Sequence, residues 1–302
     1  VGGEEEVEVE ARGGGQVAQQ EVVEEEGGGD EEEKKAIVRH LILSTPDGEV
    51  MNTVEDLKAI VHDDRFMRRY LNGFLVEYHM EHLTECNLGD RKIVLSRHNH
   101  RGDLDFVDYC TKQVVTIDPL TGQPTKTDSL PEGDQLPASV DAKRADLQSA
   151  IDGYVSRKHT NGGAGSVYAS PDGSQFFVCI SSSKQDFQNL YTAKWRSLWT
   201  VGADGTVSGL MKAQSHYFEN GNVQLNAKEE SSTNLPELTG SNLAEFVDAE
   251  EFRFQDIINT ECGENLHETF KTLKRKLTVQ GVKFNFDTLG HRMVGGPLGS
   301  PS

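Results

Sequence analysis

The stretch S-H-Y-F-E-N-G-N-V-Q-L, from Ser215 to Leu225, decides the fold. Asn220-Gly221 is the strongest short-range hairpin signal, because both residues tolerate the positive φ that a type I′ turn requires. Aromatic and apolar residues precede this turn from Thr206 to Phe218, and Val223 and Leu225 alternate with polar residues after it. We therefore predict a long antiparallel ribbon, around which the rest of the chain is organised.

Strand patterns and short connections surround this ribbon. Asp172-Gly173 and Asp204-Gly205 are further tight-turn signals, and such short connections imply antiparallel neighbours. The predicted strands, within a sheet region of residues 164–230, are Gly165 to Ala169, Gln175 to Ser182, Tyr191 to Val201, Thr206 to Phe218 and Asn222 to Lys228.

A long helix follows the sheet region, in residues 240–277. From Asn242 to Asn265 its apolar residues recur at helical spacing and form one packing side. We expect this helix to lie across the five strands and to bury one face of the sheet, with Trp195 and Trp199 packed beneath it.

The first half of the chain reads as helices followed by short strands. Residues 34–85 contain three amphipathic patterns and predict a helical stalk, in which Asp63-Asp64 caps the third helix. Residues 86–137 predict a small β meander and an exposed loop, Pro119 to Pro137. A further helix is predicted in residues 138–163. The strands expected in the meander are Lys92 to Ser96, Asp105 to Cys110 and Gln113 to Ile117.

The charge of the 302-residue chain is concentrated at its start. The net charge is −19, and residues 1–33 alone hold thirteen Asp and Glu residues against one Arg, which gives −12. A Glu/Gly tract with so few large apolar residues predicts a disordered acidic head. Four dispersed cysteines, the absence of a long apolar run and the lack of a signal-like start predict a cytosolic protein without a membrane span.

Three motifs, in the same order along the chain, carry a family resemblance. H-Y-F-E-N-G-N-V-Q-L, from His216, resembles the signature hairpin of the F-actin capping protein α subunit, the CapZ type. Lys194 to Trp199, K-W-R-S-L-W, resembles the family's W-R-S-x-W strand, and Thr269 to Leu277 resembles its F-K-x-L-R-R-x-L segment. The resemblance covers roughly residues 31 to 293.

The resemblance implies an α+β fold and a heterodimer. In that family the α subunit pairs with a homologous β subunit, their strands form one continuous antiparallel sheet, and each C-terminus forms an actin-binding tentacle. It implies a non-enzymatic subunit in the cytoplasm, at the actin cytoskeleton, that binds filament barbed ends and blocks subunit exchange. It implies no cofactor, no metal and no nucleic acid. Phosphoinositides and CARMIL- or myotrophin-type proteins are implied as regulators.

The C-terminal segment carries the candidate actin-binding residues. Residues 270 to 292 contain six Lys or Arg and one Asp, a net +5 inside an acidic chain. A basic face on a helix would steer the chain towards an acidic filament end, whereas the alternative interpretation is a solvated helix end. The candidates, of which the last three lie in a tentacle and tail of residues 278–302, are Lys271, Lys274, Arg275, Lys283, Phe286 and Leu289.

The sequence departs from the family pattern in this segment. Thr278 stands where the family has Pro, Gly281 where it usually has a basic residue, and Phe286 where it has Trp. The basic patch is therefore smaller than the family pattern implies.

Two other functions stay open on the sequence. The same module would serve an actin-related-protein filament in a motor-adaptor complex, and the sequence does not separate the two filaments. A metal-dependent enzyme using His98 and His100 is a remote alternative, because no carboxylate or Cys stands beside this pair at metal-ligand spacing.

Overall fold

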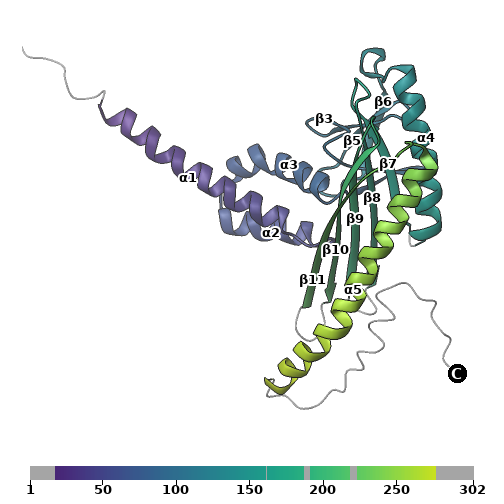
Figure 1. Ribbon diagram of the computed structural model, residues 1–302. Helices are drawn as coiled ribbons and strands as arrows, with labels where there is room; N and C mark the ends of the chain where they lie inside the picture. The colour runs from purple at the N-terminus through teal and green to yellow at the C-terminus, as the bar shows by residue number, and fades with distance from the viewer. Residues whose placement is uncertain (1–17, 161, 187–190, 218–222, 277–302) are drawn as a thin grey trace, which may run out of the picture. The chain divides into compact units, whose positions relative to one another are not determined.

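The computed structural model describes residues 18–160, 162–186, 191–217 and 223–276. The chain divides into two compact units, residues 1–78 and 79–302, which are described separately below. Figure 1 labels the helices and strands of both.

The first unit consists of three helices, as the sequence predicts. These are α1 (Ala18–Leu43), α2 (Val50–Val61) and α3 (Asp64–Glu81), the last of which ends just inside the second unit. Apolar side chains of all three helices are buried, because each helix presents one apolar stripe to its neighbours. The buried residues include Val38, Ile42, Val54, Leu57, Phe66 and Phe74.

Polar contacts cap one helix of this unit and join two of its helices. The Asp63 carboxylate accepts the backbone N–H of Phe66 at 3.0 Å, which confirms the predicted cap of the third helix. That hydrogen bond also lowers the pKa of Asp63. Lys34 reaches the same carboxylate at 3.4 Å, and Tyr70 donates to Glu31 at 2.9 Å. The last two of these partly buried contacts join α1 to the N-terminal part of α3, while apolar burial supplies most of the stability of the helices.

Helix α1 begins earlier than the composition indicates. It starts at Ala18, so it covers the second half of the segment predicted to be a disordered head, while residues 1–17 lie outside the described residues. Ala, Gln and Glu are good helix formers. Glu31 also forms an ion pair with Arg69 of α3, and Glu32 forms one with Lys35 in α1 itself.

Two small sheets open the second unit. Strands β1 (Glu85–Leu88) and β2 (Arg91–Val94) form a hairpin. A four-stranded meander contains β3 (His100–Gly102), β4 (Asp105–Asp108), β5 (Gln113–Ile117) and β6 (Pro124–Ser129), and a 3₁₀ turn (Glu132–Asp134) follows.

These sheets differ from the expectation in two places. The predicted strand at Lys92 pairs with β1 and stands outside the meander. Strand β6 lies within the segment predicted to be an exposed loop. It begins at Pro124 and its side chains are almost all exposed, so it is an edge strand without the alternating apolar pattern that reveals a strand in sequence.

The main sheet confirms the five predicted strands. Its order is β11-β10-β9-β8-β7, and every neighbouring pair is antiparallel. The outer strand β11 runs past the predicted end at Lys228, because the polar residues K-E-E-S-S-T suit an exposed edge but give no strand signal. The strands are β7 (Ala164–Ala169), β8 (Gln175–Asp186), β9 (Tyr191–Gly202), β10 (Thr206–Tyr217) and β11 (Val223–Asn234).

The register of the central ribbon differs by one residue from the predicted turn. Tyr217 pairs with Val223, which leaves an odd number of residues between the paired positions. A two-residue type I′ turn at Asn220-Gly221 would pair Glu219 with Asn222 and would leave an even number. The turn itself lies outside the described residues.

Two helices cover one face of the main sheet, where the sequence predicts one. Helices α4 (Ala138–Lys158) and α5 (Gly240–Lys276) lie on the same side of strands β7–β11 (Figure 1). The core between them and the sheet is apolar. Its fully buried members include Leu147, Ile151, Val178, Ile180, Trp199, Met211, Leu243 and Val247.

A glycine makes room for the largest side chain of this core. Gly209 pairs with Trp199 across β10 and β9, and a Cβ atom at Gly209 would lie 2.1 Å from the indole ring. The ring of Trp199 is fully buried and packs edge-on against Phe246 of α5, at 5.5 Å between ring centroids. Trp195 packs against Phe254 of the same helix with its ring tilted, at 5.2 Å between ring centroids, which confirms that both tryptophans lie under the long helix.

We predict that Gly209→Ala destabilises the protein by about 1–3 kcal/mol, because the new methyl group overpacks the core at the Trp199 ring. Gly73→Ala is the matched control. A Cβ atom at Gly73 would meet nothing within 4 Å inside α3, and Ala should stabilise the helix by up to ~1 kcal/mol. Chemical denaturation of both variants measures the difference, and equal midpoints would contradict the predicted clash.

Candidate functional site

Helix α5 starts in tight contact with α4. The Gly240 N–H donates to the Asp146 carboxylate at 3.1 Å, and the Asn242 N–H donates to the Thr239 hydroxyl at 3.2 Å. A Cβ atom at Gly240 would lie 2.8 Å from the Asp146 carbonyl oxygen, so only glycine allows this approach. The beginning of α5 is therefore fixed against α4.

A buried carboxylate connects the middle of α5 to helix α4 and to strand β9. The side chain of Glu251 accepts hydrogen bonds from Tyr154 Oη at 2.8 Å and from Ser197 Oγ at 2.5 Å, and His159 Nε2 lies 3.2 Å away. Tyr154 belongs to α4, His159 follows it, and Ser197 belongs to β9. Burial and this carboxylate raise the pKa of Tyr154, so the phenol stays a donor.

Sequence reasoning missed this polar cluster, although one signal of it was available. Glu251 lies on the apolar stripe that Val247, Phe254 and Ile258 define at helical spacing. A carboxylate on the packing side of a helix is rarely buried without partners. Its partners on α4 and β9 are remote in sequence, and no local pattern identifies them.

After crossing the sheet, α5 reaches its outer strand. Arg253 on α5 lies 3.0 Å from Glu229 of β11, and Ile258 joins the core cluster that contains Ala227 of β11. The helix then continues from Phe254 to Lys276, roughly 35 Å at 1.5 Å per residue. Figure 1 shows it running past the lower end of β11.

The candidate actin-binding residues divide between this helix and the segment after it. Lys271, Lys274 and Arg275 lie in the last turns of α5, where their spacing places them on one side of the helix. Their side chains lie outside the described residues, as do the candidates Lys283, Phe286 and Leu289.

One edge of the main sheet is closed by a side chain. The Gln148 amide of α4 donates to the Gly165 carbonyl oxygen at 3.0 Å and accepts the Val167 N–H at 2.7 Å. Both backbone groups belong to β7, so the amide takes the place of a neighbouring strand. On the same strand, Ser166 accepts the Val94 N–H at 3.0 Å and Tyr168 donates to the Val94 carbonyl oxygen at 2.6 Å.

The opposite edge is open. Over the described part of the chain, β11 is hydrogen-bonded to β10 along Val223–Asn234 and has no strand on its other side. An edge of twelve residues presents a row of unpaired backbone donors and acceptors, which is a template for another strand. Within the described residues the two edges therefore differ, because the Gln148 amide bonds backbone groups of β7 and no such group bonds the outer side of β11.

The histidine pair proposed as a metal site has structural roles. The His98 ring stacks on Phe177 at 3.6 Å between centroids, and burial lowers its pKa. His100 Nε2 lies 3.2 Å from the Asp103 carbonyl oxygen. Among the described residues, no group of three His, Cys, Asp or Glu side chains is placed to hold a metal ion. No helix in the described ranges is long and apolar enough to span a membrane.

Comparison with known proteins assigns a family to this arrangement. The sequence model described as F-actin capping protein alpha subunit matches residues 38–296. A similar relative is the F-actin-capping protein subunit alpha of Neurospora crassa, 25% identical over 270 residues, which are 88% of this chain and 97% of the relative. The Dictyostelium discoideum subunit is 23% identical over 87% of this chain and 96% of the relative.

A solved structure has the same fold. It is described as the homodimeric actin capping protein alpha subunit from Plasmodium berghei, and it aligns with a TM-score of 0.64 at 19% identity. The alignment covers 83% of this chain and 99% of that chain. At this identity the likeness establishes the α+β fold of the chain.

We predict that Glu251→Gln destabilises the protein by about 1–3 kcal/mol, because the amide cannot accept from all three donors of the buried cluster. Glu250→Gln is the control on the next residue. It removes an exposed contact with Arg253 and should change stability by no more than about 0.5 kcal/mol. Thermal and chemical denaturation compare the two, and an equal loss in both would contradict the role given to Glu251.

Proposed function

The chain belongs to the family of F-actin capping protein alpha subunits, and on that premise we propose that it caps actin filaments at their barbed ends as one half of a heterodimer. The partner is a capping protein β subunit. One observation carries the proposal. The main sheet has one edge closed by a side chain, at β7, and one open edge, at β11, and helix α5 runs beyond the open edge.

The open edge supports assembly through β11. A long unpaired edge is an aggregation hazard unless another chain or element covers it. On β7 the Gln148 amide removes that hazard, whereas on β11 nothing in the described part of the chain does so. A β subunit that adds its own edge strand to β11 would continue the sheet.

Helix α5 supports the placement of the actin contact. Its start and middle are held by Asp146 and by the Glu251 cluster, and its last turns continue past the core to Lys276. Lys271, Lys274 and Arg275 are in those last turns, within the segment of net +5. Cations on a rigid projecting helix would steer the dimer towards an acidic filament end and fix its orientation there.

Apolar residues beyond α5 complete the proposed contact. Phe286 and Leu289 would bury apolar area on the filament after the cations have brought the two together, and Lys283 would add a further charge. In this proposal the chain acts by binding, without a catalytic centre, in the cytoplasm at the actin cytoskeleton. Phosphoinositides and CARMIL- or myotrophin-type regulators stay predictions of the family resemblance.

We favour actin over the alternative filament of an actin-related protein. The relatives reported above are all named for F-actin. A metal-dependent enzyme is not favoured either, because His98 and His100 contact Phe177 and Asp103 in arrangements that need no metal.

We predict that the chain expressed alone is poorly soluble or self-associated, and that co-expression with a β subunit gives a dispersed heterodimer. Size-exclusion chromatography with light scattering measures both states. In the heterodimer, the amides of β11 should exchange hydrogen as slowly as those of the central strand β9. A dispersed monomer, or fast exchange along β11 in the complex, would contradict assembly through this edge. A stable homodimer would assign the edge to a second copy of the chain.

We predict that reversing Lys271 and Arg275 to Glu slows association with barbed ends and makes it less sensitive to salt, because steering charge is lost. Stability should change by no more than about 0.5 kcal/mol. Elongation of pyrene-actin from filament seeds at two salt concentrations measures the association rate of the heterodimer.

Two matched variants separate charge from packing in the same assay. Reversing Lys58 and Lys126, which are exposed on α2 and β6, changes the net charge equally and should leave capping unchanged. Replacing Phe286 and Leu289 by Ala should speed dissociation, since buried contact governs the off-rate. If the Lys271 and Arg275 variant caps as fast as the unmodified heterodimer at low salt, these cations are solvated surface.

A further inference from the structure

The face of the main sheet that points away from α4 and α5 carries an ordered set of side chains. Because residues alternate between faces, this face receives every second residue of β9, β10 and β11. The register aligns them in rows across the three strands. These rows are Thr200, Ser208 and Ser232; Leu198, Leu210 and Glu230; and Arg196, Lys212 and Lys228.

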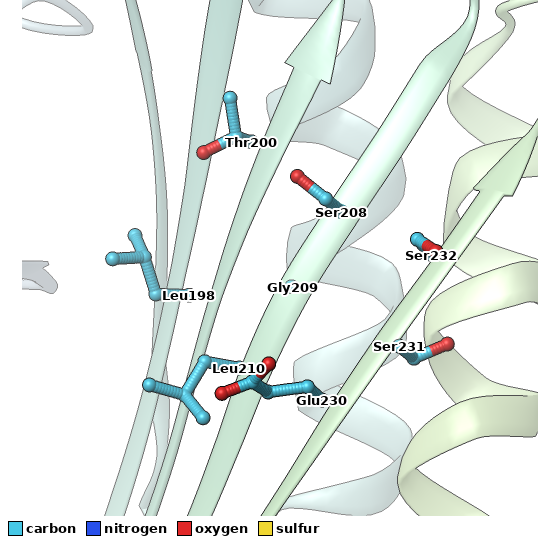
Figure 2. A pocket seen from close by; sticks show the side chains of 8 residues that line it. All are labelled: Leu198, Thr200, Ser208, Gly209, Leu210, Glu230, Ser231 and Ser232. Carbon is cyan, nitrogen blue, oxygen red and sulfur yellow. The ribbon is translucent and has the colours of Figure 1, made fainter.

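A depression of about 410 Å³ lies over the first two rows. Leu198 and Leu210 are half-buried, and the hydroxyls of Thr200, Ser208 and Ser232 stand beside them. Figure 2 shows the side chains of Leu198, Leu210 and Glu230 on the same side of the strands. The depression therefore offers two leucine side chains with hydroxyl groups at one end and the Glu230 carboxylate beside them.

The third row places three cations next to this depression. Arg196, Lys212 and Lys228 stand directly opposite one another on neighbouring strands. Like charges in directly opposed positions destabilise a sheet. Burial is the main cause that lowers the pKa of Lys212; the cations Arg196 and Lys228 lower it further, and the Glu81 carboxylate opposes them.

Two of these cations form no ion pair within the described part of the chain, although the Glu81 carboxylate acts on Lys212 at longer range. Arg196 donates to the Glu81 carbonyl oxygen and to Gln214. Within the part of the chain that the structure describes, Lys212 and Lys228 form no hydrogen bond or ion pair from their side chains. Lys212 is half-buried and Lys228 is exposed, so an anion can reach both.

We propose that this surface, the sheet groove of Leu198, Leu210, Lys212 and Lys228, binds an extended acidic segment of another protein. The cation row and the leucine row are two residues apart along the strands, which is about 7 Å. In an extended peptide, side chains two residues apart lie on one face at the same spacing. The segment therefore carries a carboxylate two residues from an aliphatic side chain.

The combination of subsites favours a peptide over a phosphate-bearing ligand. Charge complementarity alone would accept any anion at Lys212 and Lys228. The adjoining leucine side chains match an aliphatic side chain, and the hydroxyl row and the Glu230 carboxylate match the polar backbone of a peptide, whose N–H groups they can accept. This proposal is independent of the filament contact, since it uses none of the residues of the C-terminal segment.

The test uses the full-length chain in complex with its β subunit and three fluorescent peptides. The first repeats the triplet Glu-Thr-Leu, the second replaces Glu by Gln, and the third replaces Leu by Gly. Fluorescence anisotropy should show binding of the first peptide, with losses of about tenfold for each of the others. Equal affinity for all three would overturn the proposal.

Variants of the groove locate the bound peptide. Lys212→Gln and Lys228→Gln should each weaken binding of the Glu-Thr-Leu peptide by about fivefold or more, and Leu210→Ala should do so without changing its salt dependence. Lys126→Gln, an exposed lysine on β6, is the control and should have no effect. Binding that survives Leu210→Ala and all lysine changes, or stronger displacement by inositol phosphate than by unlabelled peptide, would overturn the proposal in favour of general anion attraction.

Discussion

The buried carboxylate of Glu251 is the contact on which the arrangement of the second unit depends. Apolar packing is non-directional, so the core under α5 would permit the helix to rotate or slide. Hydrogen bonds from Tyr154 and Ser197 to the Glu251 side chain fix both the rotation of α5 about its axis and the position of α5 along the sheet. A charge in this position costs several kcal/mol unless it is fully hydrogen-bonded, which makes any other placement of the helix unfavourable. The direction in which the last turns of α5 leave the sheet follows from this constraint.

Local patterns predicted most of the main sheet. Alternating residues and the Asp-Gly turns located β9 and β10, and helical spacing located α5, because these signals lie within a few residues of one another. Strand β6 and the end of β11 escaped prediction because their exposed polar residues carry no alternation. Of the candidate site, the sequence predicts a helix that holds Lys271, Lys274 and Arg275, whereas the clusters of Glu251 and Gln148 depend on remote partners that no periodicity encodes.

The two edges of the main sheet differ in the backbone groups that they leave available to another chain. Gln148 satisfies a donor and an acceptor of β7, so a second chain would gain little by approaching that edge. On β11 every outward backbone group keeps its full capacity for a partner. Among the described strands of this sheet, β11 is therefore the edge that leaves a row of backbone groups available to another strand.

The diagonal path of α5 also determines how the molecule carries mechanical load. A pull on Lys276 acts along the helix axis, and it is resisted simultaneously by Glu251, by the ring contacts of Trp195 and Trp199, and by the contact with Glu229. Contacts loaded in parallel share a force, whereas a strand peeled from an edge loses its hydrogen bonds one after another. A ligand that pulled on the end of α5 would therefore be resisted by all of these helix–sheet contacts together.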